Sequence, residues 1–301
     1  MDLSVTIGKA RFGNPVTVAS GTFDYIKDYC KVSELKKLGA ITPKTVTLNP
    51  QQGNPAPRIV ETPSGMINAI GIENDGIDAF IEGRLVVLKT LGVPLIISVS
   101  GKTEEEFQIM AEKLNKPTGL SAIELNLSCP NLKKKSLVSQ DPEATYNTVK
   151  AVKKISNLPV IAKLTPNVGD ITVIAKAAED AGADGLSMIN TFTGLVINTT
   201  TRRSAIGNFV GGLSGPAIRP IAVNMVYNVA QIVKIPIVGM GGIMTADDAL
   251  QFIIAGATMV AVGTANFIDP KAPLEVLSGI KEYMKKNKLK DLKQLRGSLV
   301  R

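Results

Sequence analysis

The segment 126–131 (NLSCPN) places Cys129 between an apolar, strand-like run and a proline. A thiol in this position can be a small inert hydrophobe, a covalent nucleophile or a proton acceptor. The chain contains two cysteines and no histidine, so the usual base for a cysteine nucleophile is missing. Neutral amides at Asn126, Asn131, Asn68 and Asn190 suit the binding of an amide-rich ring. This combination favours a base that removes a proton from carbon.

Two lysines lie inside apolar runs, Lys44 in ITPKTV and Lys163 in VIAKLT. A lysine in such a setting rarely lacks an anionic partner, because a buried unpaired charge is costly. One interpretation is that the two amines stabilise an anionic cofactor or substrate. The alternative is that they reach the solvent-exposed rim or pair with a structural carboxylate.

Glycines follow two of the last apolar runs, in GMGGIMTADD and VAVGTANF. At Gly241, Gly242 and Gly263, followed by Thr264, the absence of a side chain lets backbone N–H groups approach a phosphate closely. The helix that begins after such a loop also favours an anion. The alternative is that these glycines only permit tight turns, but their occurrence after both runs favours a phosphate site.

Eight continuous apolar runs, most of them followed by a helical pattern, must position these residues. Such runs are typical of parallel strands that are covered on both faces. We expect strands at residues 15–20, 40–46, 94–100, 122–128, 159–165, 185–190, 236–242 and 259–265. We expect helices at residues 103–115, 142–156, 171–181, 217–233 and 246–255, with Asp141 and Thr245 as N-caps.

Eight such units predict an α/β fold, a single (β/α)8 TIM barrel over residues 1–301. A doubly wound sheet is the alternative, but the chain has no dinucleotide-binding fingerprint. Two long insertions, at 47–78 and 191–216, are expected to be functional. Barrel active sites form where the strands end. Those ends carry Ser20, Lys44, Thr45, Ser98, Ser100, Asn126, Cys129, Lys163, Asn190, Thr191, Gly241, Gly242, Gly263 and Thr264.

The composition limits the classes of function. The net charge is +8, but aromatic residues are only 4% of the chain and do not interleave with the lysines, so we expect no nucleic-acid site. No apolar stretch is long enough for a membrane helix and no signal peptide is apparent. Two cysteines indicate a reduced, cytoplasmic protein and, with no histidine, no metal site.

The motifs resemble one family, the class 1 dihydroorotate dehydrogenases. The similar segments are VASGTFDY, NLSCPN, IAKLTPN, MINTFTG, GGLSGPAIRP, VGMGGI and AVGTANF, together with TPKTVTLNPQQGNPAPRIVETPSGMINAIGIEN. They run through nearly the whole chain in the family's order. The stretch GNPAPRIVETPSGMINAIG resembles the NAD-linked class 1B more than the fumarate-linked homodimers. Three departures are Ser98, where the family usually has asparagine, Asp24, where glycine is commoner, and the continuation NLKKKSLVSQ from Asn131.

The resemblance implies a barrel that binds FMN and oxidises dihydroorotate to orotate in pyrimidine synthesis. Cys129 would be the catalytic base for the C5 proton, and Lys44 would contact flavin and substrate. The implied substrate residues are Lys44, Asn68, Ala69, Ile70, Gly71, Ile72, Asn126, Asn190 and Thr191. The implied cofactor residues are Ser20, Lys44, Thr45, Asn126, Lys163, Ile189, Gly215, Gly241, Gly242, Gly263 and Thr264.

The chain has no GxGxxG motif and too few cysteines for a four-thiolate cluster. The resemblance therefore implies a partner subunit that carries FAD and a 2Fe-2S cluster, around a homodimer core in a heterotetramer. The alternatives are a fumarate-linked enzyme, a related pyrimidine-reducing flavoprotein, a barrel whose cysteine attacks its substrate, and a phosphate-binding scaffold.

Overall fold

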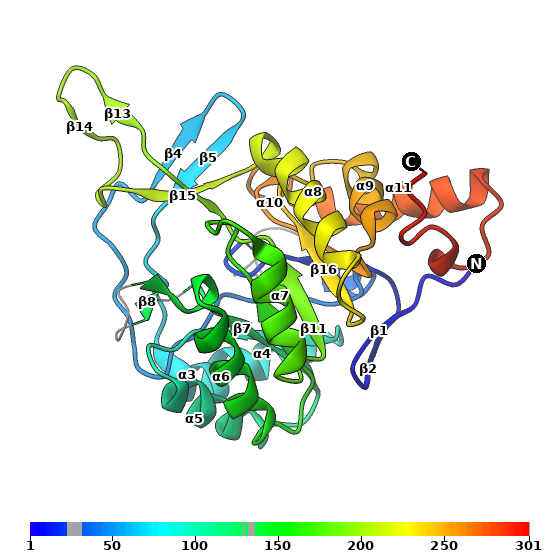
Figure 1. The fold of residues 1–301 in the computed structure, drawn as a ribbon, viewed down its shortest axis with the longest axis horizontal. Coiled ribbons are helices and arrows are strands. Elements are labelled where there is room, and N and C mark those ends of the chain that lie inside the picture. The colour runs from blue at the N-terminus through cyan, green and yellow to red at the C-terminus, as the bar shows by residue number, and fades with distance from the viewer. Residues whose placement is uncertain (23–31, 129, 132–135, 301) are drawn as a thin grey trace.

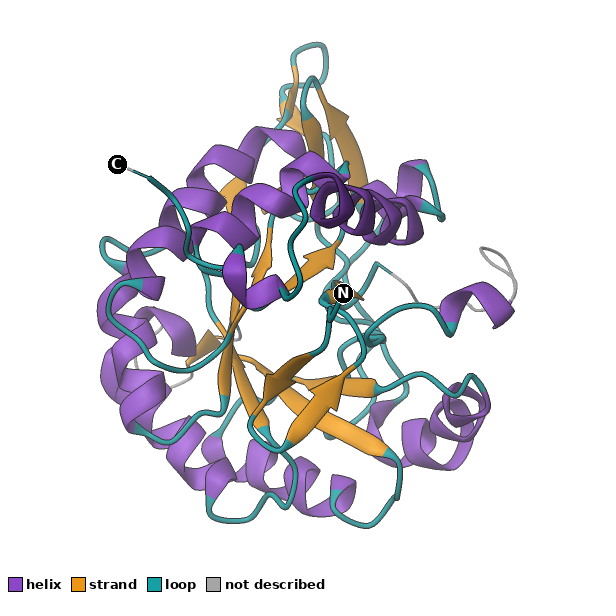
Figure 2. Cartoon of the chain, turned by 90° about the vertical axis from the view of Figure 1, so that its right-hand side faces the viewer, coloured by secondary structure: helices purple, strands orange, loops and turns teal. Residues whose placement is uncertain are grey.

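The computed structural model describes residues 1–22, 32–128, 130–131 and 136–300. Its centre is a curled sheet of seven parallel strands in the order β3-β17-β16-β11-β10-β7-β6. Helices surround this sheet as an outer ring (Figure 1 and Figure 2). The strands are β3 (Val16–Val18), β6 (Leu95–Val99), β7 (Leu120–Asn126), β10 (Val160–Lys163), β11 (Gly185–Met188), β16 (Ile237–Met240) and β17 (Met259–Val262).

The segment 40–46 does not form the regular strand that we predicted. Pro43 in its middle has no N–H to give to a ladder, so the pairing is interrupted. Two isolated parallel bridges join the segment to β6, Ile41 with Leu95 and Val46 with Val99. On the other side, the Gly39 N–H donates to the Val16 carbonyl at 2.9 Å. The segment thus lies between the two edge strands of the sheet, and the barrel prediction is confirmed.

The five predicted helices are present, with ends that differ by a few residues. They are α5 (Glu104–Leu114), α6 (Pro142–Lys153), α7 (Ile171–Asp180), α8 (Arg219–Ala230) and α9 (Ala246–Ala255). The structure adds α2 (Val32–Leu35), α3 (Gly76–Ala79), α4 (Leu85–Thr90), α10 (Ala265–Ile268), α11 (Ala272–Lys286) and helical turns at Phe80–Arg84, Val138–Gln140, Pro216–Ile218 and Leu292–Gln294. Among the described residues, no helix has the length and hydropathy needed to cross a bilayer.

Both predicted N-caps are confirmed. The Asp141 side chain accepts hydrogen bonds from the N–H groups of Glu143 and Ala144, at the start of α6. Thr245 accepts from the Asp248 N–H and Asp248 accepts in return, which makes a capping box at the start of α9. These caps satisfy N–H groups that a helix cannot satisfy itself, and they fix where the two helices begin.

The two insertions meet in one antiparallel sheet, which we call the rim sheet, with the strand order β12-β15-β5-β4. Its strands are β4 (Ile59–Thr62), β5 (Gly65–Asn68), β12 (Phe192–Gly194) and β15 (Gly211–Ser214). The pair β13 (Ile197–Asn198) and β14 (Arg203–Ser204) projects beyond it (Figure 1). A small core of Ile67, Ala69 and Ile206 stabilises the rim sheet separately from the barrel.

A hairpin occupies the opposite, amino-terminal end of the barrel, which faces the viewer in Figure 2. Its strands are β1 (Val5–Ile7) and β2 (Ala10–Phe12). Ile7 and Phe12 are fully buried, and Ile7 packs so closely on Gly185 that a Cβ there would meet its side chain at 2.9 Å. The hairpin therefore plugs this end. A last short pair joins β8 (Pro130–Asn131) to β9 (Ser136–Leu137).

Candidate active site

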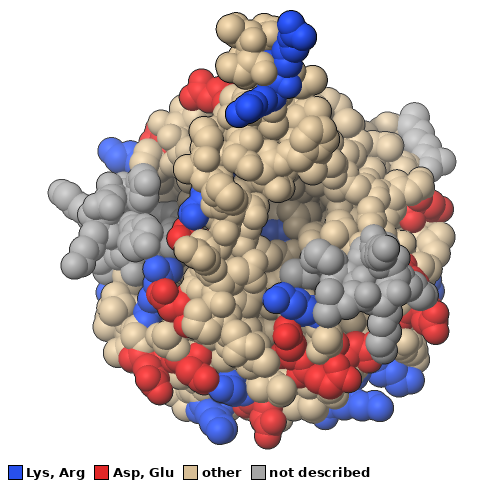
Figure 3. All heavy atoms as spheres, turned by 90° about the vertical axis from the view of Figure 1, so that its left-hand side faces the viewer, with Lys and Arg blue, Asp and Glu red and all other residues tan. Residues whose placement is uncertain are grey.

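The carboxyl-terminal ends of the barrel strands lie on the face shown in Figure 3, below the rim sheet. A hollow opens in the middle of this face, and basic atoms are visible deep inside it (Figure 3). Because the strands are parallel, the residues that follow them converge on this hollow.

Lys163 ends β10 and is only 4% exposed. Its Nζ donates a hydrogen bond to Ser20 Oγ at 3.0 Å and lies 3.8 Å from Glu124 Oε1. Glu124 is buried in β7, and its other oxygen, Oε2, accepts a hydrogen bond from Ser187 Oγ at 2.7 Å. Lys163 therefore has the carboxylate partner of the alternative interpretation, and its role toward an anionic ligand stays a prediction.

The turn after β3 also contacts the second lysine. Lys44 Nζ lies 3.5 Å from the point where a Cβ on Gly21 would stand, one residue after Ser20. In this turn, Ser20 therefore contacts Lys163, and the next residue, Gly21, lies beside Lys44. Beside them the hydroxyls of Thr45 and Ser98 are buried and 2.9 Å apart. Five residues predicted at strand ends are thus brought to one side of the mouth.

Amide side chains cluster on the neighbouring strand ends. Asn190 Nδ2 donates to Ser128 Oγ at 2.8 Å and to Asn126 Oδ1 at 3.3 Å. Asn190 Oδ1 accepts from the Thr191 N–H at 2.8 Å, and Asn167 Nδ2 donates to the Thr191 carbonyl at 3.0 Å. We call these five residues the amide cluster. They fix one another's orientation by neutral hydrogen bonds.

Asn68 ends β5 and donates to the Gly212 carbonyl at 3.2 Å, which ties the two insertions together. The four carbonyls of residues 69–72 then all accept hydrogen bonds. The donors are the backbone and side chain of Asn54 and the side chains of Gln51 and Asn74. Gly71 and Ile72 both have positive φ, 75° and 53°. Within the described part of the chain, the N–H groups of residues 70–72 have no acceptor, so they are available to an anionic ligand.

The predicted phosphate loop comes close to another backbone. Gly242 has φ 72°, and a Cβ on it would stand 2.6 Å from the Gly215 carbonyl. A Cβ on Gly263 would instead make only ordinary van der Waals contact, with its nearest neighbour, Ala19, at 3.5 Å. Among the described residues, the N–H groups of Gly242, Ile243, Gly263 and Thr264 have no acceptor. Backbone N–H groups in this state suit a phosphate.

Ile189 and Gly241 follow β11 and β16, next to each other in the sheet. Ile189 is 2% exposed and its N–H donates to the Met240 carbonyl at 3.0 Å. Its side chain lies 3.6 Å from the point where a Cβ on Gly241 would stand. Both predicted cofactor-lining residues therefore sit on the wall between the amide cluster and the phosphate loop.

The residues between Gly242 and helix α9 do not all keep open N–H groups. Asp248 Oδ2 accepts from the N–H groups of Met244 and Thr245, at 3.0 and 2.9 Å. Its other oxygen pairs with the guanidinium of Arg219, at the start of α8. Within the described residues 242–245, the N–H groups that remain for an anion are those of Gly242 and Ile243. The Arg219–Asp248 pair holds the loop rather than the ligand.

Cys129 and Cys30 lie outside the described residues, so the structure gives no geometry for the predicted base. Ser128, the last described residue before position 129, belongs to the amide cluster. Sequence reasoning did not find Glu124, Ser187 or Asp248. Glu124 carried a signal, because it stands inside an apolar run (AIELNLS) as the two lysines do. A serine in a buried strand carries no comparable signal.

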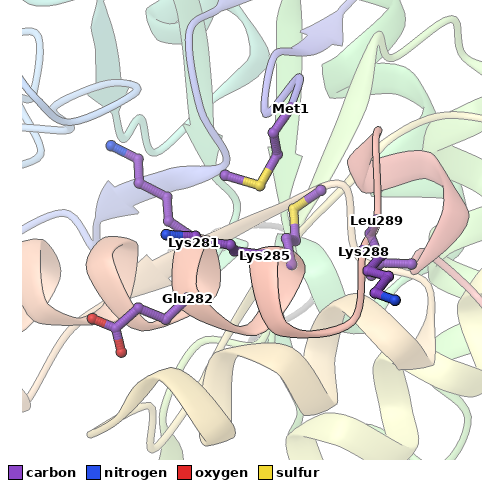
Figure 4. Close-up of a pocket in the computed structure, with 7 residues that line it drawn as sticks. Met1, Lys281, Glu282, Lys285, Lys288 and Leu289 are labelled. Atoms are coloured by element: carbon purple, nitrogen blue, oxygen red, sulfur yellow. The ribbon is translucent and has the colours of Figure 1, made fainter.

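A second hollow of about 460 Å³ lies on the far side of the molecule, between the N-terminus and α11 (Figure 4). Three lysines and one glutamate, Lys281, Lys285, Lys288 and Glu282, line it together with Met1, Met284 and Leu289. Glu282 points away from Met1 in Figure 4. Long, exposed lysine side chains hold anions weakly, so the mouth of the barrel is the better candidate for a site.

Comparisons with known proteins agree on one family. The family model described as dihydroorotate dehydrogenase matches residues 2–284. A protein of Thermoanaerobacter pseudethanolicus is 51% identical over 300 residues, 99% of each chain. One of Geotalea uraniireducens is 49% identical over 300 residues, 99% of this chain and 98% of its own. Both are named dihydroorotate dehydrogenase B (NAD(+)), catalytic subunit.

Proposed function

The chain belongs to the dihydroorotate dehydrogenase family, and from this premise we propose that it is the catalytic subunit of an NAD-linked dihydroorotate dehydrogenase. It oxidises (S)-dihydroorotate to orotate in de novo pyrimidine biosynthesis. A proton leaves C5, a hydride leaves C6 and a C5–C6 double bond forms. The observation that carries this proposal is the identity of about half over the whole length of relatives with that one name.

The mouth of the barrel fits FMN. The open N–H groups of Gly242, Ile243, Gly263 and Thr264 would hold its phosphate. Ser20, Thr45, Asn126, Ile189 and Gly215 would line the rest of the site, and Lys163 would lie at the edge of the ring that becomes negative on reduction. Bound FMN supplies the acceptor for the C6 hydride.

Cys129 takes the C5 proton on its sulfur. A base of this kind needs no histidine, because the hydride acceptor is the cofactor and the protein must accept only the proton. The amide cluster supports this role: Ser128 precedes the cysteine and receives a hydrogen bond from Asn190 at 2.8 Å. The residue just before the base, Ser128, is therefore held through its side chain by a residue that would bind the substrate.

The substrate is an amide-containing ring with one carboxylate, and the mouth offers partners for both. Asn68, Asn126, Asn190 and Thr191 would bind the ring. The open N–H groups of residues 70–72 would bind the carboxylate, together with the Lys44 ammonium. Since the carbonyls of residues 69–72 all have donors, the turn is fixed before the ligand arrives, which lowers the entropy cost of binding.

Electrons leave through a partner. The names of the relatives describe a catalytic subunit of an NAD(+) enzyme, and this chain has no nicotinamide fingerprint. We assign FAD and a 2Fe-2S cluster to that partner subunit, in a heterotetramer around a homodimer core. Ile59, Ile197 and Phe209, on and beside the rim sheet, are 44%, 57% and 72% exposed, which supports an interface there. The low cysteine content suits the cytoplasm.

The test is the absorbance spectrum of the purified chain before and after anaerobic dihydroorotate. We expect a yellow protein whose flavin band disappears on addition of dihydroorotate. A yellow protein that dihydroorotate does not bleach would contradict the substrate assignment. A colourless protein that FMN cannot reconstitute would contradict the function as a whole.

The acceptor is tested separately on the bleached protein. We expect fumarate to leave the isolated chain reduced, and NAD to reoxidise it only when the partner subunit is present. Rapid reoxidation of the isolated chain by fumarate would instead identify the fumarate-linked enzyme.

A further inference from the structure

Glu124 is a buried acid that the proposed mechanism does not use. It is 4% exposed and lies in the middle of the barrel wall, on β7. Its Oε2 accepts a hydrogen bond from Ser187 Oγ at 2.7 Å. Its Oε1 is buried and has no hydrogen-bond partner among the described residues. The closest cation to this oxygen is Lys163 Nζ, at 3.8 Å.

The sheet register places the acid directly below the lysine. In β7 and β10, Asn126 is paired with Lys163, and Glu124 comes two residues before Asn126. Side chains two residues apart in a strand share a face, so Glu124 and Asn126 both point into the barrel. Ser187 is paired with Lys163 on the other side. The carboxylate is therefore anchored deeper than the ammonium, which extends toward the mouth.

An ion pair that used both carboxylate oxygens of Glu124 would bring Oε1 within hydrogen-bond distance of the Lys163 ammonium. Here the ammonium, which has three N–H donors, gives one to Ser20 at 3.0 Å and none to Glu124 Oε1. Glu124 thus attracts the charge of Lys163 from the side away from the mouth, across 3.8 Å, and does not occupy any of its N–H donors. Since both groups are buried, water screens this attraction little.

We propose that Glu124 is a positioning residue that acts through Lys163: it holds the ammonium in place and weakens its field, and so sets the reduction potential of the bound flavin. The proposal rests on the proposed function, which places FMN over Lys163. A bare ammonium would stabilise the anionic reduced flavin strongly, and the carboxylate behind it offsets part of that effect.

The variant E124Q tests the proposal. It keeps the shape of the side chain and an oxygen for Ser187 but removes the negative charge. We expect reduced FMN to bind about tenfold more tightly relative to oxidised FMN. This corresponds to a potential about 30 mV more positive, because a tenfold ratio is 29.6 mV for a two-electron couple. The readout is an equilibrium titration against a reference dye, which does not depend on turnover.

A second pair of variants separates action through Lys163 from any other effect. In K163M the positive charge is absent. The positive shift of potential caused by E124Q should therefore be smaller in K163M than in the unmodified chain. An equal shift of potential with and without Lys163 would overturn the proposal. E124D keeps the charge but withdraws it by one methylene, so we expect a smaller positive shift; it also replaces E124Q if that variant does not fold.

A purely structural role for the pair gives a different result: E124Q would lower the unfolding temperature and leave the potential unchanged, and this would overturn the proposal. The proposed function fails in another way, visible in the unmodified chain. If the unmodified chain does not bind FMN, or binds it and is not reduced by dihydroorotate, the function is wrong, whatever the variants do.

Discussion

The two ends of the barrel differ in whether their polar groups have hydrogen-bond partners. At the carboxyl-terminal end, lysine, asparagine and glycine residues leave backbone N–H groups at residues 70–72 and 242–243 open within the described chain. At the amino-terminal end, the β1–β2 hairpin buries Ile7 and Phe12 completely. There the Asp184 carboxylate accepts from the Val160 N–H at 2.7 Å and from Lys153 at 2.6 Å.

The difference separates chemistry from stability. Polar groups that have no partner until a ligand binds contribute little to the free energy of unfolding. They can lower it, because an unsatisfied buried group is costly. The amino-terminal end, where apolar side chains are buried and polar groups are hydrogen-bonded, offsets that cost although it lies away from the site. We therefore expect substitutions at the mouth to change ligand binding and turnover, and substitutions at the plug to change the free energy of unfolding. Four experiments test this separation.

The largest effect is expected at Cys129. The variant C129S replaces the thiol by a far weaker base, so flavin bleaching by dihydroorotate should slow by roughly 10²–10⁴-fold, the usual contribution of a positioned base. Stopped-flow absorbance measures it, and the flavin content should stay unchanged. C30S is the matched control and should bleach at the normal rate. Loss of flavin from C129S would show that this residue is structural.

Next in size is the plug. I7A removes a fully buried side chain and should lower the free energy of unfolding by about 2–5 kcal/mol. I7V is the graded control, with a loss of about 0.5–1.5 kcal/mol. Denaturant titration of the holoprotein measures both. The rate of flavin bleaching in the folded fraction should not change; a parallel loss of rate would break the separation between the two ends.

A smaller effect is expected at the phosphate loop. In G242A the new Cβ meets a positive φ of 72° and the Gly215 carbonyl at 2.6 Å. The conformational cost of about 1–2 kcal/mol for a non-glycine residue corresponds to FMN binding weakened by roughly 5–30-fold. Flavin release measured by fluorescence tests this. G13A, where an added Cβ would meet nothing within 4 Å, is the control at the other end.

The smallest effect concerns pH. Burial alone raises the pKa of Glu179, but hydrogen bonds from Lys176 and the Lys234 N–H outweigh it, so the folded pKa lies below the ordinary value. A lowered folded pKa means that the carboxylate stabilises the protein above the unfolded pKa of about 4.3, and that this contribution is lost as the pH falls through the folded pKa.

The variant E179Q should therefore be less stable than the unmodified chain near neutral pH, by less than about 1 kcal/mol, because the partner Lys176 is half-exposed and water screens the pair. The two should converge in acid. Denaturant titrations at several pH values check this, and bleaching by dihydroorotate should be the same in both. A difference in stability that grows in acid would give the pKa shift the opposite sign.

The sequence predicts the barrel well because each strand–helix unit carries its own local sequence signals. Apolar runs, an Asp141 or Thr245 cap and a following amphipathic segment all agree. The segment 40–46 is the instructive failure: its apolar residues predict a strand, but Pro43 removes the donor that a ladder needs. Hydrophobicity decided where the segment lies, and one missing N–H decided that it pairs only at its ends.

The rest of the site depends on pairings that no local pattern encodes. Asn68 meets Gly212 across 144 positions, and only the folded chain shows that the two insertions form one sheet. The sequence does predict the two lysines, because a charge in an apolar run is conspicuous. Glu124 was equally conspicuous, but its importance appears only when the register sets it beside Lys163.

The rim sheet also has a consequence for how the protein is made. All four of its strands precede residue 215, whereas the barrel cannot close until β17, which ends at residue 262, pairs with β3. During synthesis at about 5–20 residues per second, the first insertion leaves the ribosome roughly 7–30 s before the second. For that interval the β4–β5 hairpin has an unpaired edge. A chaperone that covers exposed strand edges would therefore have its largest effect on the nascent chain at this stage.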